Sequence, residues 1–217
     1  MNKISEITIL IVLYDETDEI IFKNLKKIKN FKIIIVDNKG DKKLKNRITE
    51  KFEISKYYLS NKNLGFSKGF NKALNFCKTK YAFIKNADCY IDEDNIIKLY
   101  DYIKNNQDCG IVSPTSYDEY NNLSYNSGKL PENENSNEIL KVEGDVCVEK
   151  VLGSSMFVKM EDLRKVGMFN ENLFIFFSDF ELCKKIKSIN KHIVQIYNSK
   201  CIHVHGISKV KNKFYKI

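Results

Sequence analysis

The sequence ITILIVL at residues 7–13 is a nearly continuous apolar run, and the polar triplet YDE follows it at 14–16. Such runs are typical of strands that are buried on both faces, as in parallel sheets covered by helices. Apolar residues then recur with helical spacing over 21–28, and a second apolar run at 33–36 ends at Asp37. This part of the chain therefore predicts a strand, a helix and a second strand of the same sheet.

Strands and helices continue to alternate up to about residue 114, which indicates βαβ units. The expected elements are a first helix capped at Thr17 or Asp18, a Lys-rich second helix, a strand near 57–59, a helix at 66–77, a strand at 81–84, a helix over 96–103 capped near Asp92 or Asp94, and a strand at 111–112 that Pro114 closes. Residues 115–144 are polar and predict loops or short strands over the sheet, since the apolar pattern resumes at Val151. We therefore predict an α/β fold with an open, mostly parallel twisted sheet flanked by helices.

The composition is that of a single globular domain. The chain has 217 residues, and its hydrophobic share of 43% is enough for a full core. The net charge of +8 predicts either a basic surface that faces phosphate, nucleic acid or anionic lipid, or charge spread over solvated faces. The second is favoured because Lys alternates with Asp and Glu along most of the chain, and the one local basic run is at 209–216. That run predicts either contact with an anionic membrane surface or a frayed tail. Because the chain has no recognisable reader motif and no clustered basic and aromatic face, we expect no nucleic-acid partner.

The cysteines and the hydropathy pattern bear on the compartment. Six cysteines are widely scattered, without a CxxC pair or a zinc-type spacing, which predicts reduced and mostly buried thiols. We see no signal peptide, and no apolar stretch approaches the length needed to span a bilayer. We therefore expect a cytoplasmic protein, with peripheral contact at the inner face of the membrane left open.

Acidic and amide residues follow three of the predicted strands. They are Asp15 and Glu16 after the first strand, Asp37 after the second, and the segment from Asn86 to Asp88 after the fourth. Ligands of open α/β sheets bind outside the carboxyl ends of the strands. Since no Gly-rich phosphate loop is present, a bound diphosphate would need a divalent metal held by carboxylates, and a sugar nucleotidyltransferase is disfavoured for the same reason. The alternative is that these are ordinary turn and cap residues.

The segment NLGFSKGFN at 63–71 resembles the N-x-G-x-x-x-G-x-N motif of the family 2 glycosyltransferases, especially their rhamnosyltransferase-like branch. Further segments resemble that family in the same order, so that the likeness covers roughly residues 5–208. They are the opening strand at 9–14, the strand end at 36–38, FIKNAD at 83–88, VLGSSM at 151–156, VGMFNE at 166–171, FFSDFELC at 176–183 and the closing region at 201–208. Each motif is moderately specific, and their collinear order is far more so.

The resemblance implies a GT-A fold in one domain, 1–217. Residues 1–114 would form the nucleotide-sugar-binding half, 115–208 the acceptor and catalytic half, and 209–217 a basic tail. It also implies an inverting glycosyltransferase of the hexosyltransferase class (EC 2.4), of the kind used in polysaccharide biosynthesis. The donor would be a UDP- or dTDP-sugar, the cofactor Mg²⁺ or Mn²⁺, and the acceptor a glycan, a lipid-linked sugar or a protein.

The resemblance further implies roles for individual residues. Asp179 would be the general base, and Asp88 with His205 would hold the metal, with His203 as the alternative histidine. Gly153 and Ser154 would contact the donor sugar or the acceptor. The residues implied to bind the nucleotide or the donor are Tyr14, Asp37, Asn63, Gly65, Gly69, Asn71 and Asn86.

Three departures from the family pattern support an alternative function. Cys89 follows Asp88 where the family has the rest of a D-x-D motif, Ser178 replaces the first acid of "E-D", and Asn170 replaces the Asp of "F-D-E". The alternative is a non-catalytic relative that binds a nucleotide sugar or a glycan.

Asp179 also has a purely structural interpretation. Ser178 and Glu181 have the spacing of a capping box, and an acid in the first turn stabilises the helix dipole by about 0.3–1 kcal/mol. A helix start would lower the pKa of such a carboxyl. The catalytic and structural roles are compatible, because a helix start is a fixed platform for a carboxylate.

Overall fold

The computed structural model describes residues 3–128 and 143–204. The strands are β1 (Ile7–Leu13), β2 (Lys32–Asp37), β3 (Lys56–Leu59), β4 (Tyr81–Lys85), β5 (Cys89–Tyr90), β6 (Cys109–Tyr117), β7 (Ser127–Gly128), β8 (Val146–Val148), β9 (Lys150–Val151), β10 (Ser155–Lys159) and β11 (His192–His203). The helices are the 3-10 helix η1 (Lys3–Glu6) and the α-helices α1 (Asp18–Lys27), α2 (Lys42–Thr49), α3 (Gly65–Phe76), α4 (Glu93–Asn105), α5 (Met160–Lys165) and α6 (Ser178–Ser188).

Among the described residues, nine strands form one sheet, in the order β3-β2-β1-β4-β10-β6-β11-β5, with β8 paired to β11. The half formed by β3, β2, β1 and β4 is parallel, as predicted. The other half is mixed, because β10 runs antiparallel to both β4 and β6. The short strands β7 and β9 pair separately.

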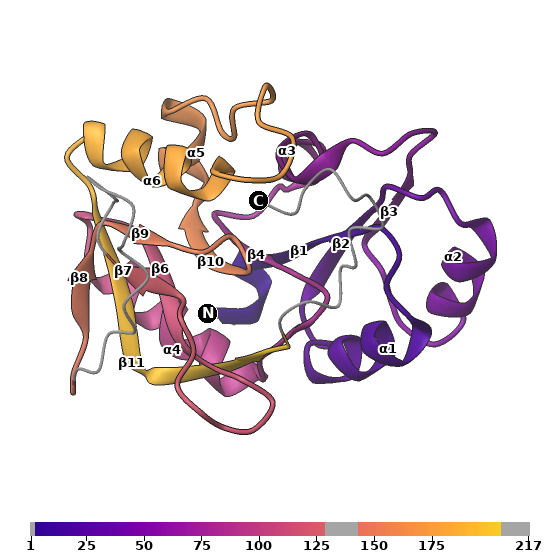
Figure 1. Ribbon diagram of the computed structural model, residues 1–217, viewed down its shortest axis with the longest axis horizontal. Coiled ribbons are helices and arrows are strands. Elements are labelled where there is room, and N and C mark those ends of the chain that lie inside the picture. The colour runs from indigo at the N-terminus through magenta and orange to yellow at the C-terminus, as the bar shows by residue number, and fades with distance from the viewer. Residues whose placement is uncertain (1–2, 129–142, 205–217) are drawn as a thin grey trace, which may run out of the picture.

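Helices cover both faces of the sheet (Figure 1). One core lies between the sheet and helices α1, α2 and α4, and the other lies between the sheet and helices α3, α5 and α6. Strand β1 contributes to both cores, since Ile9 and Ile11 pack in the first and Leu10 packs in the second. Burial on both faces is the reason that β1 reads as a continuous apolar run.

Two local expectations are wrong. Pro114 does not close its strand, because β6 continues to Tyr117 along β11. Pro114 lies opposite Ile196, directly before a bulge in β11, and proline is tolerated at such irregular positions in a sheet. Thr17 precedes α1 in an extended conformation but makes no side-chain cap, whereas Asp92 caps α4 by accepting the N–H of Asn95.

Two further observations concern the cysteines and the lengths of the helices. All six cysteines lie among the described residues, and five of them are buried while Cys147 is exposed. Within residues 3–128 and 143–204, we find no helix with both the length and the apolar character needed to cross a membrane.

Candidate active site

The carboxyl ends of β1, β2 and β4 meet at one edge of the sheet. Leu13 at the end of β1 lies opposite Asp37 at the end of β2, and Ile11 lies opposite Lys85 at the end of β4. The acidic and amide residues that follow these strands therefore share the edge at which open α/β sheets bind ligands.

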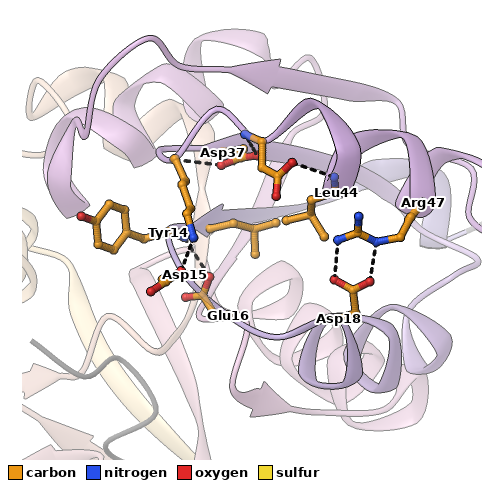
Figure 2. A pocket seen from close by; sticks show the side chains of 10 residues that line it. Tyr14, Asp15, Glu16, Asp18, Asp37, Leu44 and Arg47 are labelled. Atoms are coloured by element: carbon orange, nitrogen blue, oxygen red, sulfur yellow. Dashed lines mark hydrogen bonds and ion pairs between the residues drawn. The ribbon is translucent and has the colours of Figure 1, made fainter. Parts of the chain in front are cut away.

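A hollow at this edge lies between the ends of β1 and β2 and helix α2 (Figure 2). Its two cations are already paired within it, Lys39 with Asp15 and Arg47 with Asp18. The lining residues are Leu13, Tyr14, Asp15, Glu16, Asp18, Asp37, Lys39, Asp41, Leu44 and Arg47. Carboxylates outnumber cations, so the hollow suits a base or a ribose better than a bare phosphate.

Asp37 is 1% exposed, and its carboxylate holds the turn after β2. Its Oδ1 accepts the backbone N–H groups of Lys39 and Gly40, each at 2.9 Å. Its Oδ2 accepts the N–H of Asp41 at 3.0 Å and the hydroxyl of Tyr57 at 3.2 Å. Asp37 therefore stabilises the turn, as the alternative interpretation of the sequence held. It also lines the hollow.

A path of hydrogen bonds connects the end of β4 to Asp179 at the start of α6. The N–H of Asn86 donates to the carbonyl of Ser154 at 3.1 Å. The N–H of the neighbouring Gly153 donates to Oδ2 of Asp179 at 2.9 Å, and the N–H of Phe180 donates to Oδ1 at 3.0 Å. Asn86, Gly153, Ser154 and Asp179, all of which the resemblance implied as site residues, therefore lie close together.

Burial raises the pKa of the Asp179 carboxyl above its usual range. The N–H groups of Gly153, Phe180 and Asp179 itself, together with the ammonium of Lys150, act in the opposite direction but are outweighed. The lowered pKa expected from a helix start is therefore wrong for this residue. A carboxylate with a raised pKa is a stronger proton acceptor, provided that it is ionised at the working pH.

The capping box expected at Ser178 does not form. Phe177 precedes the first helical residue and adopts a left-handed conformation, with φ 65° and ψ 0°. The Ser178 side chain is fully buried, and its hydroxyl accepts a hydrogen bond from Ser67 of α3 at 2.7 Å. The carboxylate of Asp179 is held by the N–H groups of Gly153 and Phe180 and takes no part in a capping box.

Lys150, at the start of β9, is a buried cation close to Asp179. It is 1% exposed, and its Nζ lies 4.4 Å from the ring centroid of Phe180 and 5.4 Å from that of Tyr125. Burial lowers the pKa of Lys150, and attraction to Asp179 partly offsets this. Burial and the charge of Asp179 raise the pKa of Tyr125 to about 12. No sequence signal identifies Lys150, because lysine is too frequent in this chain.

Asp88, which lies between β4 and β5, is next to His203, the last residue of β11. Oδ1 of Asp88 lies 3.3 Å from Nε2 of His203, and both residues are 7% exposed. Mn²⁺ binds both carboxylate oxygens and imidazole nitrogens. Mg²⁺ prefers oxygen ligands and would bind chiefly the carboxylate of such a pair. Residues 3–128 and 143–204 contain no group of three or more His, Cys, Asp or Glu side chains arranged for a metal. His205, which the resemblance implied as a ligand, lies outside the described residues.

Two buried residues that sequence reasoning missed hold the loop that carries Asp88. Nδ2 of Asn24 donates to the carbonyls of Ala87 and Cys89, at 2.6 and 2.8 Å, on either side of Asp88. Nζ of Lys85 donates to Oδ1 of Asn24 at 2.6 Å, and burial lowers the pKa of Lys85 to about 8. Asn24 interrupts the apolar face of α1, and a polar residue at a core position is the signal that could have identified it.

The first part of the 63–71 segment shapes the start of α3. Oδ1 of Asn63 accepts the N–H of Gly65 at 2.9 Å. Gly65 has a φ of 72°, and a Cβ at this position would lie 2.3 Å from the carbonyl oxygen of Phe174. Gly69 packs α3 closely on β1, because a Cβ there would lie 3.0 Å from the side chain of Val12.

Asn71 joins α3 to the segment before α6. Its Nδ2 donates to the carbonyl of Phe169 at 2.9 Å and to Oε1 of Glu171 at 3.1 Å. Its Oδ1 accepts the N–H of Phe169 at 3.0 Å. All these contacts are internal, so a donor-binding role for residues 63–71 stays a prediction.

Similarity to known proteins covers most of the chain. The model of the family described as Glycosyl transferase family 2 matches residues 8–165, a range that ends before Asp179 and His203. A curated relative, the dTDP-rhamnosyl transferase RfbF of Shigella flexneri, is 27% identical over 194 residues, which is 85% of this chain and 64% of the relative.

Two solved structures share the fold. GalNAc-T7 with UDP, GalNAc and Mn²⁺ gives a TM-score of 0.75 at 13% identity, covering 94% of this chain and 45% of that one. The mannosyltransferase PcManGT from Pyrobaculum calidifontis, in complex with GDP-Man and Mn²⁺, gives 0.68 at 15% identity, covering 92% and 56%. The predicted α/β fold of GT-A type is confirmed, and the chain spans less than two thirds of each of these three proteins.

Proposed function

The chain belongs to glycosyl transferase family 2, and from this premise we propose that it is an inverting glycosyltransferase (EC 2.4) that moves a sugar from a UDP- or dTDP-sugar to a glycan, lipid-linked or protein acceptor. The observation that carries the proposal is the path of contacts from Asn86 through Ser154 and Gly153 to Asp179. It supports the proposal because a proton-accepting carboxylate then lies beside the edge at which the sheet would bind a nucleotide.

The donor would lie along this edge. The hollow beside Tyr14 and Asp37 would take the base and the ribose, and the acids there disfavour phosphate. The 63–71 segment is tied to the residue that follows Asp37, since Nδ2 of Asn38 donates to the carbonyl of Gly65 at 2.9 Å. The name of the Shigella relative makes dTDP-rhamnose the first donor to test.

The metal would be held by Asp88 and Nε2 of His203, whose donor chemistry fits Mn²⁺ or Mg²⁺. When bound, a divalent ion neutralises the diphosphate and stabilises its departure. Asn24 and Lys85 would keep Asp88 in place, because both brace its loop. His205, outside the described residues, is the further ligand that the resemblance implied.

The chemical role of this chain is to accept one proton. Asp179 takes the proton of the acceptor hydroxyl while that oxygen bonds to the anomeric carbon, opposite the bond to the diphosphate that breaks. The Gly153 N–H fixes the carboxylate, and because Gly153 and Ser154 adjoin it, we expect them to contact the donor sugar or the acceptor. Attack opposite the leaving group inverts the anomeric centre.

Thermal unfolding with a panel of UDP-, dTDP- and GDP-sugars, with and without Mn²⁺, tests the proposal. A donor at 100 times its dissociation constant should stabilise the protein by about 2.7 kcal/mol. Chromatography of the reaction products then separates transfer from hydrolysis. If no nucleotide sugar stabilises the protein in either condition, the proposal is wrong. Release of free sugar without any glycosylated product would also contradict it.

Replacing Asp37 with Ala should weaken binding of free UDP or dTDP by about 1–3 kcal/mol, because a buried hydrogen-bond acceptor is lost. The melting temperature should fall as well, since the three hydrogen bonds of the carboxylate within the turn and the one from Tyr57 of β3 are removed. Calorimetry on folded protein measures the first effect. Tyr57→Phe removes one of the four bonds but does not line the hollow, so it should leave nucleotide affinity intact. Equal affinities in both variants and the parent would leave Asp37 with only its turn role.

Replacing Lys150 with Met should move the acidic limb of the rate profile to higher pH. Asp179 must be ionised to act, so the rate falls as the pH drops through its pKa, and loss of the neighbouring ammonium raises that pKa further. The other titratable groups near Asp179, Tyr125 and Cys183, are neutral at the relevant pH because burial raises the pKa of both to about 12. Lys187→Met is the control, since Lys187 is exposed and pairs with Glu149. An unshifted acidic limb in a folded Lys150→Met variant would exclude this role.

A further inference from the structure

Four consecutive large apolar side chains are exposed just before Asp179. Phe174, Ile175, Phe176 and Phe177 are 53%, 42%, 56% and 66% exposed. We call residues 174–177 the apolar loop. At roughly 200 Å² for each large apolar side chain, the exposed area is on the order of 400 Å². Patches of this size on soluble proteins are often binding surfaces.

The backbone of the apolar loop is fixed although its side chains are exposed. The N–H of Phe66 donates to the carbonyl of Phe174 at 2.7 Å, and the hydroxyl of Ser67 donates to that of Ser178 at 2.7 Å. The segment between α5 and α6 accordingly passes beside α3 (Figure 1). Phe177 keeps a left-handed φ of 65°, which bulky residues rarely adopt. Anchored at both ends, the loop presents its apolar side chains to solvent.

The chemistry of the apolar loop favours a lipid surface over a sugar ring. None of its four side chains carries a hydrogen-bonding group, whereas a bound sugar needs polar partners for its hydroxyls. Lys68 on α3 and Lys184 on α6 are exposed lysines on the two helices that adjoin the loop, and the chain has a net charge of +8. Such cations are attracted to anionic headgroups.

We propose that the apolar loop inserts its side chains into the interfacial region of an anionic lipid bilayer. Phe176 and its neighbours bury apolar surface there, and Lys68 and Lys184 face the headgroups. The identity of the acceptor follows from this membrane contact together with the proposed function, on which it rests. Because the loop leads directly into Asp179, the acceptor hydroxyl belongs to a lipid-linked sugar presented at the same surface.

Vesicle flotation tests the inference. The parent should bind vesicles that contain phosphatidylglycerol, and Ile175→Ser with Phe176→Ser should weaken binding at least tenfold, because two large apolar side chains no longer leave water. Tyr120→Ser is the matched control, since Tyr120 is 78% exposed but lies on the turn after β6. Its replacement should leave vesicle binding unchanged. Lys68→Gln and Lys184→Gln should each weaken binding about fivefold. They should have no effect on phosphatidylcholine vesicles.

Three results would overturn the inference: no vesicle binding by the parent, equal binding by the Ile175/Phe176 variant, or loss of binding only when residues 209–217 are removed. Sedimentation that shows a dimer dissociated by the same variant would also overturn it, because a second copy would then cover the loop. Donor-dependent thermal stabilisation, measured on the same proteins, keeps the two proposals apart. Intact vesicle binding without stabilisation by any nucleotide sugar contradicts the proposed function and leaves the membrane contact standing.

Discussion

Replacing Asp179 with Asn should slow sugar transfer by about 10²–10⁴-fold, the usual size of general-base catalysis. The amide oxygen can still accept the N–H of Gly153, so the start of α6 and much of the donor affinity should be kept. The amide cannot take up the proton of the acceptor hydroxyl, and the loss should therefore fall on turnover. Initial rates at saturating donor and acceptor, measured beside calorimetric donor affinity, separate the two effects.

Ser178→Ala is the matched control for Asp179→Asn. It removes the hydroxyl that binds Ser67 at the helix start but spares the carboxylate next to it. We expect it to lower stability while turnover stays close to that of the parent. If Asp179 only favours the helix dipole, its own replacement should cost at most about 1 kcal/mol of stability and leave turnover intact. Parental turnover in a folded Asp179→Asn protein would thus remove the catalytic assignment.

The parallel half of the sheet could be predicted because its strands are buried on both faces. Ile9 and Leu10 enter opposite cores, so β1 has no polar alternation and reads as one apolar run. The mixed half was harder to predict, because β10 pairs with β4 and β6 although it is distant from both in the chain: β4 ends at Lys85 and β6 at Tyr117, whereas β10 begins only at Ser155. Nothing local in residues 155–159 indicates that they insert antiparallel between two earlier strands.

The histidine that faces Asp88 could not be chosen from spacing alone. Side chains alternate along a strand, but the bulge in β11 between Ile196 and Lys200 changes which residues share a face. Only the pairing of β11 with β5 places His203 opposite Cys89 and hence beside Asp88. The partner of Ser178 could not be predicted from spacing either. Phe177 before it adopts a left-handed conformation, and the Ser178 hydroxyl contacts Ser67 of α3.

The second large effect is expected for Asp88→Asn, which removes a charge but almost no volume. Donor affinity in Mn²⁺ should fall to the level that the parent shows in EDTA, because the carboxylate that would hold the ion beside His203 is lost. Transfer should slow by about 10³-fold, since a metal contributes several kcal/mol to the stabilisation of a departing diphosphate and each 1.36 kcal/mol is tenfold in rate. Calorimetry with a nucleotide sugar in Mn²⁺ and in EDTA measures the change in donor affinity without requiring turnover.

Asp92→Asn is the control for charge and position. Asp92 is an exposed carboxylate four residues further along the chain that caps α4, and Asn caps a helix equally well. Its replacement should leave the dependence on Mn²⁺ unchanged. His203→Gln should reproduce the effect of Asp88→Asn on donor affinity, because both residues would contribute to the same ion. If the parent binds its donor equally well in EDTA and in Mn²⁺, or if Asp88→Asn keeps the full difference between the two, the pair of Asp88 and His203 does not hold the metal.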